Sequence, residues 1–245
     1  MILKLIQIEI IKTKRSLALL MMFLSPFVVV LVNVLVFIKS DGKIIAEKGW
    51  SIYWLQNYSM WGYFMMPLYI ALITALLNGI EHNNNGWRYM MSLPIKQSDL
   101  FIAKLILTWI VIQGANLVLY LTVLLTIIIF DQLGYKGNNL VSIDSSISLL
   151  YASVASLAIL TIQHIVSWQW KNIVVPIGLG VIATMSIVQF SSSEYWQFDP
   201  WTYILMSTNA SNADMQSKAL INSVLISGIL LFISSLWLNK RDINC

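Results

Sequence analysis

The chain is organised around the segment Glu81-His82-Asn83-Asn84-Asn85-Gly86-Trp87-Arg88-Tyr89-Met90-Met91-Ser92-Leu93-Pro94-Ile95-Lys96-Gln97-Ser98-Asp99. This is the longest polar-rich interruption between two strongly apolar segments on one side of the chain. The asparagines that lead to Gly86 predict one turn, and Pro94 predicts a second. Between them lie mostly apolar side chains and the charge of Arg88, which predicts a short helix with one apolar side. Such a helix can lie in a membrane interface or dock on another protein, and both interpretations stay open.

The composition around this segment is that of a membrane protein. Of the 245 residues, 58% are hydrophobic and only 11% are charged, whereas soluble domains carry about 25% charged residues. Apolar runs of about 20 residues predict an all-α, polytopic membrane protein. The net charge of +4 comes from basic residues scattered among loops, so we expect no nucleic-acid partner. The only cysteine is Cys245, which excludes a disulfide within the chain.

We predict a single transmembrane domain, residues 1–245, that begins with a basic, apolar lead-in at 1–16. A helix lying in the membrane interface would suit this lead-in, although Glu9 and Lys12 interrupt its apolar positions. The expected six membrane spans are residues 17–38, 61–80, 100–130, 147–168, 173–190 and 219–238.

Two of the predicted loops contain many aromatic residues. The first loop, 39–59, ends in tryptophans and tyrosines, which we interpret as an interfacial belt. In the loop at 191–217, Asp199-Pro200 is typical of a helix N-cap followed by proline. We therefore expect a short helix at 200–206 on the outer surface. It would bury Trp201, Ile204 and Leu205.

The distribution of basic residues predicts the orientation in the membrane. Six spans place both termini on one side. That side would carry ten basic residues: Lys4, Lys12, Lys14, Arg15, Arg88, Lys96, Lys104, Lys171, Lys240 and Arg241. The other side would carry five: Lys39, Lys43, Lys48, Lys136 and Lys218. Basic residues favour the cytoplasmic side. We therefore expect a protein of the bacterial plasma membrane with both termini and the segment 81–99 in the cytoplasm.

Motifs for catalysis are absent from the sequence, and we expect no enzyme activity and no catalytic residue. There is no G-x-x-x-x-G-K-[ST] segment, so the chain has no P-loop with which to hydrolyse ATP. His82 and His164 lie far apart in sequence without cysteine or carboxylate clusters, which argues against a metal site. The predicted spans carry essentially no charges in their interiors, which argues against an ion-coupled secondary transporter.

Several polar and aromatic residues could line a substrate path. The candidates are Asn33, Asn78, Gln113, Asn116, Gln189, Trp196 and Trp201. The alternative is that the polar members form hydrogen bonds between helices, each worth about 0.6 kcal/mol in a membrane. For any single residue we favour the alternative.

At particular residues the chain resembles the permease subunits of ABC-2-type exporters, and most of all the lantibiotic-immunity permeases of Gram-positive bacteria. The first part of the resemblance is a basic lead-in with Glu9, Lys12 and Lys14, then Leu24-Ser25-Pro26 in the first span and Met65-Met66-Pro67 in the second. Glu81, the run Trp87-Arg88-Tyr89-Met90-Met91-Ser92-Leu93-Pro94-Ile95, and Ala103-Lys104 complete it. It covers most of residues 1–110, and the C-terminal half matches in hydropathy alone.

The resemblance implies an exporter in which two permeases, identical or related, bind two copies of a cytoplasmic ABC ATPase. ATP and Mg would be bound by that ATPase, and this chain would carry no cofactor. The ATPase would press on a coupling helix in the segment 81–99. The residues implied in coupling are Glu81, Trp87, Arg88, Tyr89, Met90, Met91, Leu93 and Pro94.

The implied cargo is a lantibiotic or a similar membrane-active peptide, expelled to give a bacterium immunity to its own product. Two alternatives remain. One is an exporter of another amphiphile, such as an antibiotic or a lipid-linked sugar. The other is a membrane scaffold or accessory subunit that transports nothing. An importer is disfavoured because Glu81, Gly86 and Pro94 are too closely spaced for the cytoplasmic loop of that class.

Overall fold

The computed structural model describes residues 2–14, 16–40, 49–83, 95–137, 140, 143–208 and 212–240, and all regular structure in them is helical. The helices of the first half are α1 (Ile2–Thr13), α2 (Leu17–Lys39), α4 (Trp50–Met60), the π-helix η1 (Trp61–Met65), α5 (Met66–Asn83) and α7 (Gln97–Gln132). Those of the second half are α8 (Ile143–Ala155), α9 (Leu157–Gln169), α10 (Val174–Phe190), the 3-10 helices η2 (Glu194–Phe198) and η3 (Pro200–Thr202), α11 (Tyr203–Ser207) and α12 (Ala213–Lys240).

Four described helices are long and apolar enough to cross a membrane: Leu17–Lys39, Trp50–His82, Gln97–Gln132 and Ala213–Leu238. The pair formed by α8 and α9 is bent by 40° and would make a fifth span if it crosses as one unit. The 17 residues of α10 form a shorter apolar helix. The prediction of an all-helical membrane protein is confirmed, and the count of six spans stays a prediction.

The outer surface of this helix assembly is apolar, as a lipid environment requires. Only 17% of the most apolar window of α12 is buried inside the protein, and 22% of that of α2. Large side chains such as Ile182 and Phe232 are 72% and 66% exposed. Because such surface is costly to expose to water, these helices fit a hydrocarbon environment.

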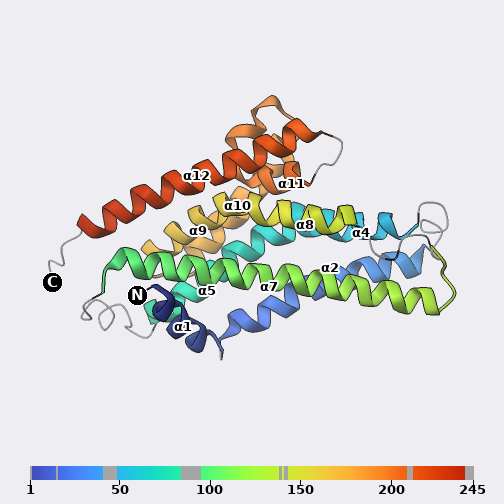
Figure 1. The fold of residues 1–245 in the computed structure, drawn as a ribbon, viewed down its shortest axis with the longest axis horizontal. Helices are drawn as coiled ribbons and strands as arrows, with labels where there is room; N and C mark the ends of the chain where they lie inside the picture. The colour runs from blue at the N-terminus through green and yellow to red at the C-terminus, as the bar shows by residue number, and fades with distance from the viewer. Residues whose placement is uncertain are drawn as a thin grey trace.

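The helices run back and forth along the long axis of the molecule (Figure 1). The longest, α7, has 36 residues, which corresponds to about 54 Å, so it reaches beyond a hydrocarbon core of about 30 Å. Figure 1 places α1, the C-terminal ends of α5, α9 and α12, and the N-terminal end of α7 together at the left end of the molecule. The segment 84–94 connects α5 to α7 at this end and lies outside the described residues.

The region predicted as the first loop differs from the structure. Residues 50–60 form α4, which continues through η1 into α5, so the helix begins eleven residues before the predicted span. Trp50 and Trp54 are fully buried. Phe37 of α2 contacts Trp50 and stacks on Phe130 of α7 with ring centroids 4.2 Å apart. The prediction of an aromatic interfacial belt is therefore wrong here. Aromatic composition alone does not distinguish a belt from a buried cluster.

Two glycines allow helices to approach closely. A Cβ atom added to Gly114 of α7 would lie 2.5 Å from Met22 Sδ of α2, so the two helices cross closely at this point. A Cβ atom added to Gly180 of α10 would collide with Ala71 Cβ of α5 and would lie 2.9 Å from Gln163 Nε2 of α9. Ala71 Cβ is fixed to the backbone of α5, so glycine is needed at position 180, whereas the flexible side chain of Met22 can shift to admit a larger residue at position 114.

The predicted short helix after Asp199 is present but lies in a different environment. Asp199 caps it, because its Oδ1 accepts a hydrogen bond from the Trp201 N–H at 3.1 Å, and Pro200 follows in the first position. Trp201 and Ile204 are buried, as expected, whereas Leu205 is only partly buried. The helix α11 contacts α8, α12 and η1. It is therefore enclosed by the bundle instead of lying on the outer surface.

Candidate coupling site

Four charged side chains from three helices meet where α5 ends and the segment 84–94 begins. Glu9 and Lys12 come from α1, Glu81 from the last turn of α5, and Lys104 from the second turn of α7. We call these four residues the ionic cluster. The Lys104 ammonium is 2.6 Å from Glu9 Oε2 and 3.4 Å from Glu81 Oε1. The Lys12 ammonium is 2.9 Å from Glu9 Oε1 and 2.8 Å from Glu81 Oε1.

The orientation of α1 brings its charges inward. Leu5, Glu9 and Thr13, spaced by four residues, form its buried stripe against α7, since residues four apart share one face of a helix. Its exposed side carries Leu3 and Ile11, which are 77% and 66% exposed. A helix that turns a carboxylate toward the protein and leucine and isoleucine outward is suited to lipid contact. This agrees with the predicted interfacial position, which stays a prediction.

Burial makes the pairing within the ionic cluster essential. The side chains of Glu9, Glu81 and Lys104 are only 4%, 5% and 2% exposed. Charges removed from water are tolerated only when opposite charges and hydrogen bonds compensate them. Two carboxylates and two ammonium groups give the cluster no net charge. Burial lowers the pKa of Lys12, but hydrogen bonds and charge attraction from Glu81 and Glu9 outweigh this effect and leave the pKa above its ordinary value.

A second, neutral cluster holds the other face of the α5 end. The Asn78 amide donates to Ser167 Oγ at 2.6 Å and lies 3.2 Å from His164 Nδ1, both on α9. His164 Nε2 lies 3.2 Å from the carbonyl oxygen of Phe101 on α7. A neutral imidazole with its proton on Nε2 satisfies both contacts, because Nδ1 then accepts from Asn78. His164 is therefore a buried histidine with partners on both ring nitrogens.

The end of α5 is thus fixed from two sides. The ionic cluster joins it to α1 and α7, and Asn78 joins it to α9. The ring of His82, in the last turn, also lies with Nε2 3.3 Å from the carbonyl oxygen of Ser167. A force on the segment 84–94 would therefore act on the end of α5, which is bonded to α1, α7 and α9.

The predicted coupling residues are only partly visible. Trp87, Arg88, Tyr89, Met90, Met91, Leu93 and Pro94 lie outside the described residues. Glu81 is described, and its carboxylate points into the ionic cluster instead of toward a partner's surface. Its part in coupling stays a prediction, and its position is that of an anchor for the segment.

Three residues of the ionic cluster were not singled out as site residues by the sequence. Glu9 and Lys12 appeared as interruptions of the apolar positions in the lead-in, and Lys104 as one more basic residue near the start of a span. The available signal was the presence of one acid and one base at otherwise apolar positions. Such a charge needs a partner, because isolated charges are costly in an apolar environment.

The predicted substrate-path residues are dispersed through the structure. Asn33 donates to the Val29 carbonyl of its own helix at 3.0 Å, and Asn78 belongs to the neutral cluster. Asn116 accepts from Trp61 Nε1 at 2.9 Å and donates to Ser153 Oγ at 3.0 Å and to Gln113 Oε1 at 3.4 Å. The contacts of Asn78 with α9 and those of Asn116 with Trp61 and Ser153 are the interhelical hydrogen bonds of the alternative interpretation, whereas the bonds to Val29 and Gln113 lie within one helix. A role along a path stays untested.

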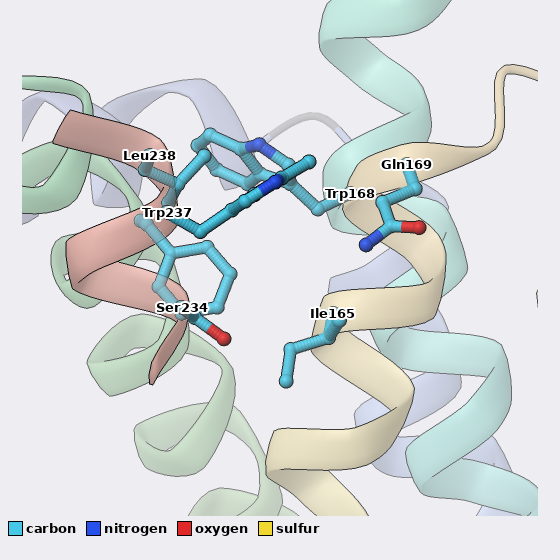
Figure 2. Close-up of a pocket in the computed structure, with 7 residues that line it drawn as sticks. Ile165, Trp168, Gln169, Ser234, Trp237 and Leu238 are labelled. Carbon is cyan, nitrogen blue, oxygen red and sulfur yellow. The ribbon is translucent and has the colours of Figure 1, made fainter. Parts of the chain in front are cut away.

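The remaining path candidates lie elsewhere. Gln189 is exposed near the end of α10, and Trp196 and Trp201 are buried beside η3 and α11. A small pocket of about 20 Å³ lies at the same end of the molecule as the ionic cluster, between the N-terminal part of α7 and the C-terminal parts of α9 and α12. Figure 2 shows the side chains of Trp168 and Trp237 extending into the space between α9 and α12. The volume is close to that of a single water site, so this pocket does not accommodate a peptide.

Among the residues that the structure describes, no group of three or more histidine, cysteine, aspartate or glutamate side chains is arranged to hold a metal ion. Comparison with curated proteins and with solved structures found no match.

A family model described as ABC-2 family transporter protein matches residues 5–187, which is more than half of the chain. The match includes α1 from Leu5 onward, the segment 84–94 and all four residues of the ionic cluster. It therefore extends far beyond the residues on which the sequence resemblance rests. With its apolar helices and no P-loop of its own, the chain belongs to the ABC-2 family of transporter proteins as a membrane permease subunit.

Proposed function

We propose that this chain is the permease subunit of an ATP-driven exporter that expels a lantibiotic or a similar membrane-active peptide and thereby gives a bacterium immunity to its own product. Two cytoplasmic ATPase subunits bind ATP and Mg and supply the energy. A second permease, identical or related, completes the transport path in the plasma membrane. Family membership supports the permease role and a partnership with an ATPase, and the resemblance at residues 1–110 supports the peptide substrate.

The observation that carries the coupling part of this proposal is the ionic cluster at the root of the segment 84–94. A segment that receives a push from an ATPase has to be attached to helices that respond as a unit. Glu81 precedes the segment and Lys104 follows it, and the two meet 3.4 Å apart in a buried site that also contains Glu9 of α1. A displacement of the segment therefore acts on α1, α5 and α7 together.

The arrangement of the helix ends is consistent with six spans and cytoplasmic termini. The helix α1 and the C-terminal end of α12 lie at the same end of the molecule as the ionic cluster (Figure 1). The excess of basic residues assigned to this end favours the cytoplasm. On this topology, Trp87 and Arg88 face the cytoplasm, where an ATPase can reach them.

A resistance assay tests the proposal. A strain that lacks the gene is complemented with the wild type, with the double variant Trp87→Ala/Arg88→Ala, or with Lys218→Met, which changes an exposed lysine far from the coupling segment along the chain. The wild type and Lys218→Met should restore resistance to a lantibiotic, and the double variant should not. Restored resistance to another class of amphiphile alone would contradict the peptide substrate. If the strain that lacks the gene and the strain complemented with the wild type are equally resistant to every compound tested, a scaffold is favoured over an exporter.

A further inference from the structure

Two of the helices that cross the molecule are interrupted in the middle, and the interruptions lie beside each other. The first is the π-helix η1, between α4 and α5. The second is the break at Ser156, where α8 and α9 meet at 40°. The helix α4 contacts α8 on one side of the interruptions, and α5 contacts α9 on the other. Interruptions of this kind mark positions where a helix changes shape most easily.

A line of hydrogen bonds through α7 joins the two interruptions. Trp61, the first residue of η1, donates from Nε1 to Asn116 Oδ1 at 2.9 Å. Asn116 donates in turn to Ser153 Oγ at 3.0 Å, and the Ser153 carbonyl accepts from Ser156 Oγ at 2.8 Å. Every one of these side chains is at most 5% exposed. Asn116 lies near the middle of α7, twelve residues from Lys104, which corresponds to about 18 Å.

The break is satisfied from its far side by α12. In an unbroken α-helix the Ala158 N–H would bond to the Val154 carbonyl. Here the Ala158 N–H donates to Ser223 Oγ at 3.1 Å. That hydroxyl lies 3.1 Å from the Val154 carbonyl oxygen and 2.8 Å from the Ala155 carbonyl oxygen. One serine therefore supplies both an acceptor and a donor to backbone groups that the bend leaves free. Ser227, one turn further along α12, bonds instead to Thr161 Oγ1 at 2.9 Å, below the break.

We propose that Asn116 is a positioning residue that makes the two interruptions act as one hinge. A change of backbone geometry at the break displaces Ser153, and Asn116 transmits this displacement to Trp61 and the π-helix. The parts of the chain on one side of the hinge, α4 and α8, then change their angle to α5 and α9 together. The role of this motion in transport rests on the proposed function, but the hinge itself is a property of this chain alone.

Hydrogen–deuterium exchange of the full chain in lipid nanodiscs tests the hinge without any ATPase. Ser223→Ala leaves the Ala158 N–H without its acceptor. It should speed amide exchange about fivefold at residues 155–158, the effect of losing one hydrogen bond. It should also speed exchange at 61–65, although Ser223 makes no described hydrogen bond with η1. In the background of Asn116→Leu, the effect of Ser223→Ala at 61–65 should disappear while its effect at 155–158 remains.

Ser227→Ala is the matched control, because it removes a serine of the same helix whose hydroxyl bonds away from the break, and it should leave 61–65 unchanged. If Asn116→Leu does not fold, Ser153→Ala cuts the same line by one bond and should abolish the effect on 61–65 equally. The proposal is overturned if Ser223→Ala leaves exchange at 61–65 unaltered, or if its effect there persists without Asn116. Because no nucleotide or peptide is involved, either failure leaves the exporter proposal standing, and failure of the resistance assay leaves the hinge standing.

Discussion

Replacing Lys104 with methionine removes the most deeply buried cation of the ionic cluster and keeps most of the side-chain volume. Glu9 then loses its contact of 2.6 Å and Glu81 its contact of 3.4 Å. Lys12 remains bonded to both carboxylates, so two buried anions share one partly exposed cation. Removal of one partner from a buried ion pair typically costs about 3–5 kcal/mol. We expect Lys104→Met to lower the free energy of unfolding by about 3 kcal/mol.

Two comparisons make this prediction specific. Lys12 is 32% exposed, and its removal leaves Lys104 with both carboxylates, so Lys12→Met should cost only about 1 kcal/mol. Glu9→Gln should be destabilising in the wild type but neutral or stabilising in the Lys104→Met background, because it then removes one of two buried anions that share the single cation Lys12. Such dependence on background identifies a direct interaction.

The assay is reversible unfolding in mixed micelles of dodecyl maltoside and sodium dodecyl sulfate, followed by tryptophan fluorescence. Trypsin cleavage after Lys14 reports separately whether α1 has detached. The control is Lys218→Met, since its partner Asp214 is 70% exposed and such a surface pair contributes less than about 1 kcal/mol. The reasoning is refuted if Lys104→Met costs no more than Lys218→Met, or if the effects of Lys104→Met and Glu9→Gln are additive.

Three further predictions concern packing, the π-helix and pH. Gly180→Ala should destabilise the fold by about 1–3 kcal/mol through overpacking against Ala71. Gly178→Ala should cost far less, because its Cβ would meet no atom within 4 Å. Equal losses of unfolding free energy in micelles would contradict the close crossing at Gly180. Trp61→Phe leaves Asn116 Oδ1 without its donor and should cost about 1–3 kcal/mol more than Trp50→Phe. Trp50 is the control because its Nε1 has no hydrogen-bond partner in the described structure. Equal losses for the two variants in the same unfolding assay would contradict the bond between Trp61 and Asn116. The pKa of Lys12 is raised above its ordinary value of 10.5, so its contribution is complete below that pH and is lost as pH rises through the folded-state pKa. The stability gap between wild type and Lys12→Met should therefore stay constant at neutral pH and close only above about pH 10.5, and a gap that closes near pH 7 would contradict this pairing.

The sequence predicted those features that depend on local residue types. Long apolar runs placed helices at each of the expected spans, and Asp199-Pro200 located a capped helix start. Each of these features requires only neighbouring residues or the general demand that apolar segments avoid water. Residues 50–60 were misinterpreted because aromatic residues are common both in interfacial belts and in buried clusters.

The candidate site was predictable only in part because its residues come from three distant segments. Glu9, Glu81 and Lys104 each belong to the residues on which the family resemblance rests, yet nothing in the sequence pairs them. The break at Ser156 had no local signal either, since neither proline nor glycine occurs there. Its free backbone groups are satisfied by Ser223, a partner that only the packed structure reveals.

The most direct test of the central claim is the ATP hydrolysis that copurifies with the chain from its native membrane in mild detergent. The account predicts vanadate-sensitive hydrolysis with the tagged wild type and with Lys218→Met, and its loss with Trp87→Ala/Arg88→Ala while the amount of permease is unchanged. Hydrolysis no higher than in an untagged preparation, or equal hydrolysis with the double variant, would contradict the claim that an ATPase drives this permease through the segment 84–94.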